Sequence, residues 1–233
     1  MSTVSIRKTM GDDYAAIKAA VDQVIADIGG IEDIIKPGYK VIIKPNLVAC
    51  PTDRLSGGVT RWEVCLAIYE AVKALGAEPV IAESSAAGAD TELTIAKCGY
   101  QELRDKGIPV IDLKQKENAR CTVEIEDGEV FKKINTWELV RDADAIITVP
   151  VMKTHDQTEE RAQYAQRGHD ARRKVGKTRV PQRKNHAVLI DVLRHVAGFA
   201  VRVAHFGVLQ KIRPCRGKGI AEEVHIVPRL FFF

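Results

Sequence analysis

The sequence contains few cysteines, and no two of them form a C-x-x-C pair. The five are Cys50, Cys65, Cys98, Cys121 and Cys215. An iron–sulfur cluster needs four thiolates, commonly at close spacing, so this chain has no iron–sulfur ligand set and its cofactor is unknown. Unpaired cysteines in odd number are typical of a reducing compartment, where most serve as small core residues. We therefore expect a cytoplasmic protein.

Long hydrophobic runs and several well-known motifs are also missing. The longest apolar segment, residues 187–209, is interrupted by Asp191, Arg194 and Arg202, so no membrane partner is expected. The N-terminal residues do not show the charged segment followed by an apolar segment that is typical of a secretory signal peptide, so we do not expect secretion. The Walker, H-E-x-x-H and G-x-S-x-G motifs are absent, which argues against a P-loop, a tightly held zinc ion and a nucleophilic serine.

Charge is distributed unevenly along the chain. Residues 1–157 contain 19 Lys+Arg and 25 Asp+Glu, a net charge of −6, whereas residues 158–233 contain 16 and 6, a net charge of +10. A basic segment can bind nucleic acid. However, aromatic side chains that would stack on bases are almost missing from residues 161–184, where only Tyr164 occurs. We therefore do not expect nucleic acid as a partner.

Apolar residues recur at helical spacing in some segments and form short continuous runs in others. Helices are predicted at 12–28, 60–75, 91–97 and 100–105, and strands at 40–44, 78–84, 108–113 and 144–150. Thr60 and Glu63 match a capping box at the start of the second helix. Alternation on both sides of Asp127-Gly128 predicts a hairpin.

Short apolar strands that alternate with helices predict an α/β fold, with a mostly parallel sheet, helices on both faces and one hairpin insertion. Ligands of such sheets bind beyond the carboxyl ends of the strands. Polar residues follow four of the predicted strands. They are Pro45-Asn46, Glu83-Ser84-Ser85, Asp112 and Lys153-Thr154-His155-Asp156. We expect these groups to face one crevice.

Two lysines at strand ends indicate binding of a small anionic molecule, because an ammonium suits phosphate, carboxylate or developing negative charge. The structural alternative is that Lys44 and Lys153 only extend their charge to solvent. His155 would transfer protons or hold a metal, although a lone histidine can equally be structural. Our hypothesis assigns Lys153 and His155 to catalysis, and substrate binding to Lys44, Asn46, Ser84 and Thr154.

Whether a metal is bound stays open, because the ligand candidates are far apart in the sequence. The candidates are His155, Glu83 and Asp156, and a metal site would require these side chains to converge.

Two motifs, "VIIKPNLV" and "DADAIITVPVMKTH", stand about a hundred residues apart. Between them lies "GGVTRWEVCLAIYEAVKALGAEPVIAESS". In this order the segments resemble domain-of-unknown-function family 362, over about residues 1–157. Some members of that family are described as iron–sulfur proteins, which implies an iron–sulfur protein as a candidate partner of this chain.

Residues 158–233 depart from the family pattern, and residue usage changes at the same place. The first segment has 6 Arg and 13 Lys, whereas the second has 11 Arg and 5 Lys. We therefore predict an α/β domain at 1–157 and a basic tail at 158–233. The tail is either disordered or translated out of frame, or it is a divergent but real part of the protein.

Three hypotheses of function follow, and the sequence leaves open whether the protein is an enzyme. The first is an enzyme, or the remnant of one, that acts on a small anionic substrate at the carboxyl edge of the sheet. The second is a non-catalytic binding or redox-accessory module that works with an iron–sulfur protein. The third is a truncated product without function.

Overall fold

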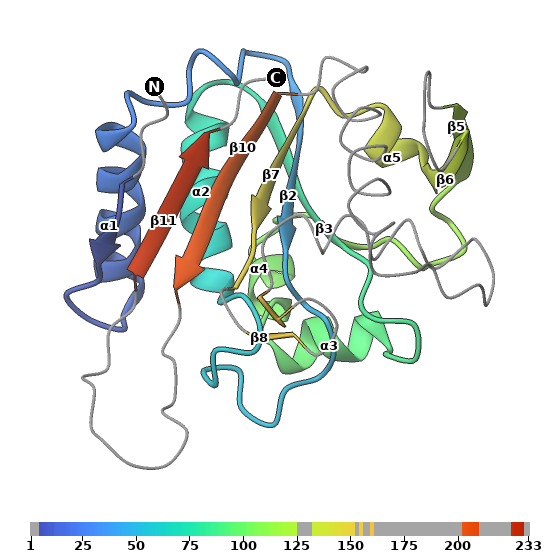
Figure 1. Ribbon diagram of the computed structural model, residues 1–233, viewed down its shortest axis with the longest axis horizontal. Helices are drawn as coiled ribbons and strands as arrows, with labels where there is room; N and C mark the ends of the chain where they lie inside the picture. The colour runs from blue at the N-terminus through green and yellow to red at the C-terminus, as the bar shows by residue number, and fades with distance from the viewer. Residues whose placement is uncertain are drawn as a thin grey trace.

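The computed structural model describes residues 5–124 and 132–151, together with the backbone of short strands at 154–155, 159–160, 202–209 and 225–230. Seven strands among these residues form one sheet (Figure 1). They are β1 (Arg7–Lys8), β2 (Lys40–Pro45), β3 (Glu78–Glu83), β4 (Val110–Asp112), β7 (Ala145–Val149), β10 (Arg202–Leu209) and β11 (His225–Leu230).

The strand order is β1-β11-β10-β7-β2-β3-β4. The five strands from β10 to β4 run parallel to one another, whereas β11 is antiparallel to both β10 and β1. The central strands read as apolar runs because both of their faces are covered, which is the pattern of a parallel sheet. The predicted α/β fold with a mostly parallel sheet is therefore confirmed.

Two antiparallel pairs lie outside this sheet. Strands β5 (Arg120–Glu124) and β6 (Lys133–Trp137) form the predicted hairpin insertion, with Val123 opposite Ile134. The Asp127-Gly128 turn itself lies outside the described residues. Strands β8 (Thr154–His155) and β9 (Glu159–Glu160) form the second pair.

Helices cover the two faces of the sheet unequally. The larger core packs the sheet against α1 (Tyr14–Asp27) and α2 (Trp62–Ala74), which also contact each other. On the other face, α5 (Glu138–Arg141) packs near a smaller cluster that includes Ile42 and Ala82. The arrowheads of β2 and β7 point toward α3 (Thr91–Lys97) and α4 (Gln101–Asp105), so these two helices mark the carboxyl edge (Figure 1).

The predicted capping box at the start of α2 is wrong. The helix begins at Trp62, and Arg61 occupies the N-cap position without a side-chain cap hydrogen bond. The Thr60 hydroxyl instead donates to the carbonyl of Val149 and accepts from the backbone N–H of Asn46. Long-range hydrogen bonds at the end of the sheet therefore take the group that local spacing had assigned to the helix.

Two strands from the second half of the chain belong to the sheet. Strand β10 pairs in parallel with β7, and β11 pairs with β10. Both strands fall within residues 158–233, the segment predicted to be a poorly matched tail. The domain boundary at residue 157 stays a prediction. In the parts of the chain that the structure describes, no helix combines the length and the apolar character needed to cross a membrane.

The short edge strand β1 is attached to α1 through one carboxylate. The Arg7 guanidinium donates to both oxygens of Asp27, at 2.6 and 2.8 Å, and the Ser5 hydroxyl donates to the same carboxylate. These hydrogen bonds, the largest contribution coming from Arg7, hold the pKa of Asp27 well below its ordinary value of 3.8. The folded protein therefore favours the ionised form of Asp27, and ionised Asp27 in turn stabilises the fold.

We expect this carboxylate to contribute to acid sensitivity. Because its pKa is lowered in the folded state, its stabilisation is present above about pH 4 and is lost as pH falls toward the lower folded value. The thermal unfolding midpoint of wild type should be higher than that of Asp27→Asn at pH 7, and the two midpoints should converge toward pH 2. Asp22→Asn on the same helix is the control, because Asp22 bonds to Lys18 and not to β1. A gap between wild type and Asp27→Asn that is equal at both pH values would contradict this account.

Candidate functional site

The carboxyl ends of β2, β3, β4 and β7 meet at one edge of the sheet because these neighbouring strands are parallel. The register places Lys44 opposite Thr148 and Glu83 opposite Asp112. Three of the predicted substrate-binding residues, Lys44, Asn46 and Ser84, are therefore at or just beyond strand ends on adjacent strands, as expected for a ligand site of an α/β sheet.

Lys44 and Glu83 form an ion pair at this edge. The Lys44 Nζ lies 3.2 and 3.3 Å from the two carboxylate oxygens, and the side chains are 16% and 5% exposed. The same carboxylate accepts hydrogen bonds from the backbone N–H groups of Leu47, at 3.1 Å, and Ser84, at 2.7 Å. Glu83 thus fixes the loops that follow both strands, and Lys44 takes part in the site as one half of an ion pair.

The predicted polar residues beyond the strands are buried and hold the loops in place. Asn46 is 2% exposed, and its side-chain amide donates to the carbonyl of Gly58 at 3.2 Å. Ser84 is also buried. The Ser85 hydroxyl donates to the carbonyl of Leu47, which ties the loop after β3 to the loop after β2. This network gives the edge a defined shape on which a ligand could be held.

Asp112 closes the turn after β4. Its carboxylate accepts from the backbone N–H of Lys114, at 2.8 Å, and from the side-chain amide of Gln115, at 3.2 Å. The Lys114 ammonium in turn donates to the carbonyls of Ala86 and Ala89 in the loop after β3. Asp112 therefore has a clear structural role at the edge.

The remaining predicted site residues follow β7 along the chain. Lys153 and Asp156 lie outside the described residues, and Thr154 and His155 are described only as the backbone of β8. The catalytic roles of Lys153 and His155 and the binding role of Thr154 stay predictions. Strand β8 begins shortly after β7 ends at Val149, so the chain reaches it from the same edge of the sheet.

The side chains that the structure describes give no support for a metal centre. Among the residues that the structure describes, no group of three or more His, Cys, Asp or Glu side chains could hold a metal ion. The Glu83 carboxylate is surrounded by an ammonium and two N–H donors rather than by further ligands. Its predicted convergence with His155 and Asp156 stays a prediction.

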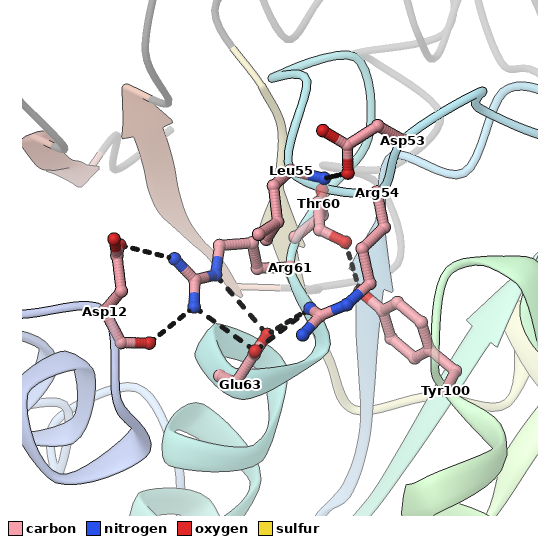
Figure 2. A network of polar contacts seen from close by, with 8 residues as sticks. All are labelled: Asp12, Asp53, Arg54, Leu55, Thr60, Arg61, Glu63 and Tyr100. Carbon is pink, nitrogen blue, oxygen red and sulfur yellow. Dashed lines mark hydrogen bonds and ion pairs between the residues drawn. The ribbon is translucent and has the colours of Figure 1, made fainter. Parts of the chain in front are cut away.

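Thr60 is a residue of this edge whose role the sequence did not reveal. It is fully buried, and its hydroxyl lies between Asn46 and Val149, at 2.8 Å from the nitrogen and 2.6 Å from the oxygen. The Tyr100 hydroxyl donates to the Thr60 carbonyl at 3.1 Å (Figure 2). The one signal in the sequence is Pro45, whose missing N–H prevents β2 from continuing its ladder, but nothing in the sequence says which residue replaces it.

The sequence also gave no indication of a buried ion network beside Thr60. Glu63 accepts from the guanidiniums of Arg54 and Arg61, and Arg61 also donates to Asp12 (Figure 2). The side chains of Arg61 and Glu63 are only 5% and 6% exposed. These residues come from separate loops and from α2, so no fixed spacing could have indicated their contact.

A cavity of about 470 Å³ lies at the opposite, amino end of the strands. Its lining includes two lysines, Lys40 and Lys73, and two acidic residues, Glu78 and Asp142. These charges balance, and the position is the edge at which parallel sheets do not usually bind ligands. We therefore regard the carboxyl edge as the stronger candidate, and the amino-end cavity serves as the rival site in the experiments below.

Fold and edge together define an α/β protein with a mostly parallel sheet and a polar carboxyl edge. Residues 41–160 match the family model described as Domain of unknown function (DUF362). This match covers about half of the chain, and the chain belongs to this family, as the resemblance of its motifs implied. The family description states no activity.

Comparison with individual proteins finds a distant relative. The thylakoid-associated protein sll1697 of Synechocystis sp. is 25% identical over 159 residues, which are 67% of this chain and 47% of that protein. The chain therefore spans about half the length of this curated relative.

Among solved structures, the lactate racemase apoprotein of Thermoanaerobacterium thermosaccharolyticum has 13% identity and a TM-score of 0.47, over 88% of this chain and 50% of its own. A Thermotoga maritima structural-genomics protein has 15% identity and a TM-score of 0.43, over 93% and 53%. Both similarities are distant.

Proposed function

We propose that the protein is an enzyme that acts on a small anionic molecule bound at the carboxyl edge of the sheet. The observation that carries this proposal is the Lys44–Glu83 ion pair at the ends of two adjacent parallel strands. Lys44 would bind the negative charge of the substrate, with Asn46, Ser84 and Thr154 orienting it.

The ion pair suits this role because it positions an ammonium in advance. An ammonium has three N–H donors. In Lys44 they face the two Glu83 oxygens and, at a long 3.4 Å, the carbonyl of Pro45. An incoming anion can take the place of that weak third contact. Because Glu83 already restricts the side chain, Lys44 would lose little conformational freedom when the ligand binds.

The catalytic groups of the proposal lie after β7. Lys153 would stabilise negative charge that develops during the reaction, and His155 would transfer a proton near neutral pH. A cytoplasmic location stays an expectation. An iron–sulfur partner protein belongs to the alternative function, in which the chain is a non-catalytic binding or redox-accessory module.

The test is calorimetric titration with a panel of small carboxylates and phosphates. Lys44→Ala should lower the affinity for the tightest-binding ligand by roughly ten- to a hundredfold, which is the loss expected for a hydrogen bond to a charged group. Lys153→Ala should weaken the same ligand, and the double variant should lose less than the sum because the two lysines share it.

Lys40→Ala is the matched control, since Lys40 begins strand β2, Lys44 lies next to its last residue, and Lys40 lines the amino-end cavity. It removes the same charge from the same strand and should leave affinity unchanged. If Lys40→Ala weakens binding while Lys44→Ala does not, the ligand uses the amino-end cavity and the proposal fails. If both variants and wild type bind none of the panel, the proposal of a small anionic substrate also fails.

A further inference from the structure

Two free cysteines lie near the same face of α3, one in a neighbouring loop and one at the end of the helix itself. Cys50 is exposed in the loop of residues 46–61, which connects β2 to α2 and contains no helix or strand. Cys98 is the C-cap residue of α3 and is 1% exposed. Figure 1 shows the loop beside α3, and the contact described next confirms that they touch.

Thr94 links the two cysteines. The Cys50 sulfur lies 3.5 Å from the Thr94 hydroxyl. The Cys98 N–H donates to the Thr94 carbonyl at 2.9 Å, so the helical geometry continues to Cys98 and places it one turn beyond Thr94. Residues four apart on a helix share one face. The Cys50 sulfur therefore faces the side of α3 that carries Cys98.

The electrostatics of Cys98 agree with this placement. The pKa of its thiol is raised to about 12, chiefly by burial and next by the nearby Cys50 thiol. A charge on one sulfur therefore acts on the other. Cys50, by contrast, is open to solvent, so a reagent in solution meets Cys50 first.

We propose that Cys50 and Cys98 form a reversible disulfide under oxidation, which would fasten the 46–61 loop to α3. This inference does not depend on the proposed anion site. The Cα atoms of a disulfide stand about 4.4–6.8 Å apart. Because Cys50 now contacts Thr94, it has to move along α3 by roughly one helical turn, about 5 Å. The shift falls on residues 49–53, which contain no helix or strand and lie between two residues that are held in place. The Val48 carbonyl accepts from the Ala86 N–H, and the Arg54 guanidinium donates to Glu63.

The chemistry with hydrogen peroxide as oxidant balances in two steps. The Cys50 sulfur attacks one peroxide oxygen, the O–O bond breaks, and the products are a sulfenic acid at Cys50 and one water molecule. The Cys98 sulfur then attacks the Cys50 sulfur. The S–OH bond breaks, and the hydroxyl leaves with the Cys98 thiol proton as a second water. The two cysteines lose two hydrogens and the peroxide is reduced.

The experiment uses the full chain, treated with hydrogen peroxide, then blocked with an alkylating reagent and digested with trypsin without reduction. The expected product joins peptide 41–54, which contains Cys50, to peptide 98–104, which contains Cys98, with the loss of two hydrogens. Reduction should separate the peptides. Oxidation should also raise the unfolding midpoint by roughly 5 °C or more, because the bridge closes a long segment of chain.

Cys50→Ser should abolish both the linked peptide and the rise in midpoint, whereas Cys121→Ser on the hairpin strand β5 should change neither. A second variant, Cys98→Ser, should leave Cys50 to accumulate as the sulfenic acid. Three results would overturn the inference: a bridge that joins Cys50 or Cys98 to another cysteine, a linkage between two copies of the chain, or Cys50 oxidised to its acids while Cys98 stays a free thiol.

Discussion

Replacement of Thr60 by valine should lower the free energy of unfolding by about 2–6 kcal/mol. The substitution keeps the side-chain shape but removes the hydroxyl that joins the Asn46 N–H to the Val149 carbonyl. Two buried backbone groups would lose their partner, and each such loss costs about 1–3 kcal/mol. Urea unfolding of the purified protein, followed by circular dichroism, measures the change.

Thr60→Ser is the matched control, because it keeps the hydroxyl and removes only a methyl group. Its cost should be about 1 kcal/mol, in the range of a single buried methyl group. Pro45, the register neighbour of Val149, has no N–H with which to replace the lost contact. If Thr60→Val and Thr60→Ser are equally stable, the hydroxyl does not hold β2 and β7 together in the way described.

Glu63→Gln should be comparably destabilising, by about 3–5 kcal/mol. The substitution removes the negative charge that Arg61 and Arg54 share, and Arg61 is almost completely buried. Its remaining acidic partner, Asp12, is 84% exposed and therefore compensates the buried guanidinium poorly (Figure 2). The cost arises because a buried charge is left without its counter-ion. Chemical denaturation gives this difference directly.

Glu70→Gln on the same helix provides the comparison. Glu70 is 43% exposed and lies 3.8 Å from Lys18, so its replacement should cost less than about 1 kcal/mol. A smaller effect of Glu63→Gln than of Glu70→Gln would show that the buried network contributes no stability. The loss of stability caused by Arg54→Ala should lie between those of Glu63→Gln and Glu70→Gln. The Arg54 side chain is 32% exposed, and Glu63 keeps its contact with Arg61 in this variant.

Much of the fold could be predicted because short-range patterns determine it. The apolar run of residues 40–44 became β2, and the helical spacing of 12–28 became α1. Helix α3 occupies the predicted residues, from Thr91 to Lys97. The parallel arrangement followed from alternation of strands and helices, which also located the carboxyl edge. These features depend on residues that are close in the sequence, where periodicity is informative.

The contacts that shape the edge could not be predicted in the same way. Lys44 and Glu83 are 39 residues apart, and nothing in either strand shows that their side chains meet. Thr60 matched a local capping pattern, yet its hydroxyl bonds to Val149, 89 residues away. Local preference loses to a buried long-range partner in such cases, because an unsatisfied backbone group inside the protein is more costly than an uncapped helix end.

We propose that the carboxyl edge, and not the amino-end cavity, binds the substrate. The most direct measurement is a crystal structure of the wild-type protein with the tightest-binding carboxylate or phosphate of the panel. We predict density for the ligand within hydrogen-bond distance of Lys44 Nζ and beside the Asn46 and Ser84 loops. Density for the ligand between Lys40 and Lys73, with the Lys44–Glu83 pair unchanged and without a ligand, would contradict this prediction.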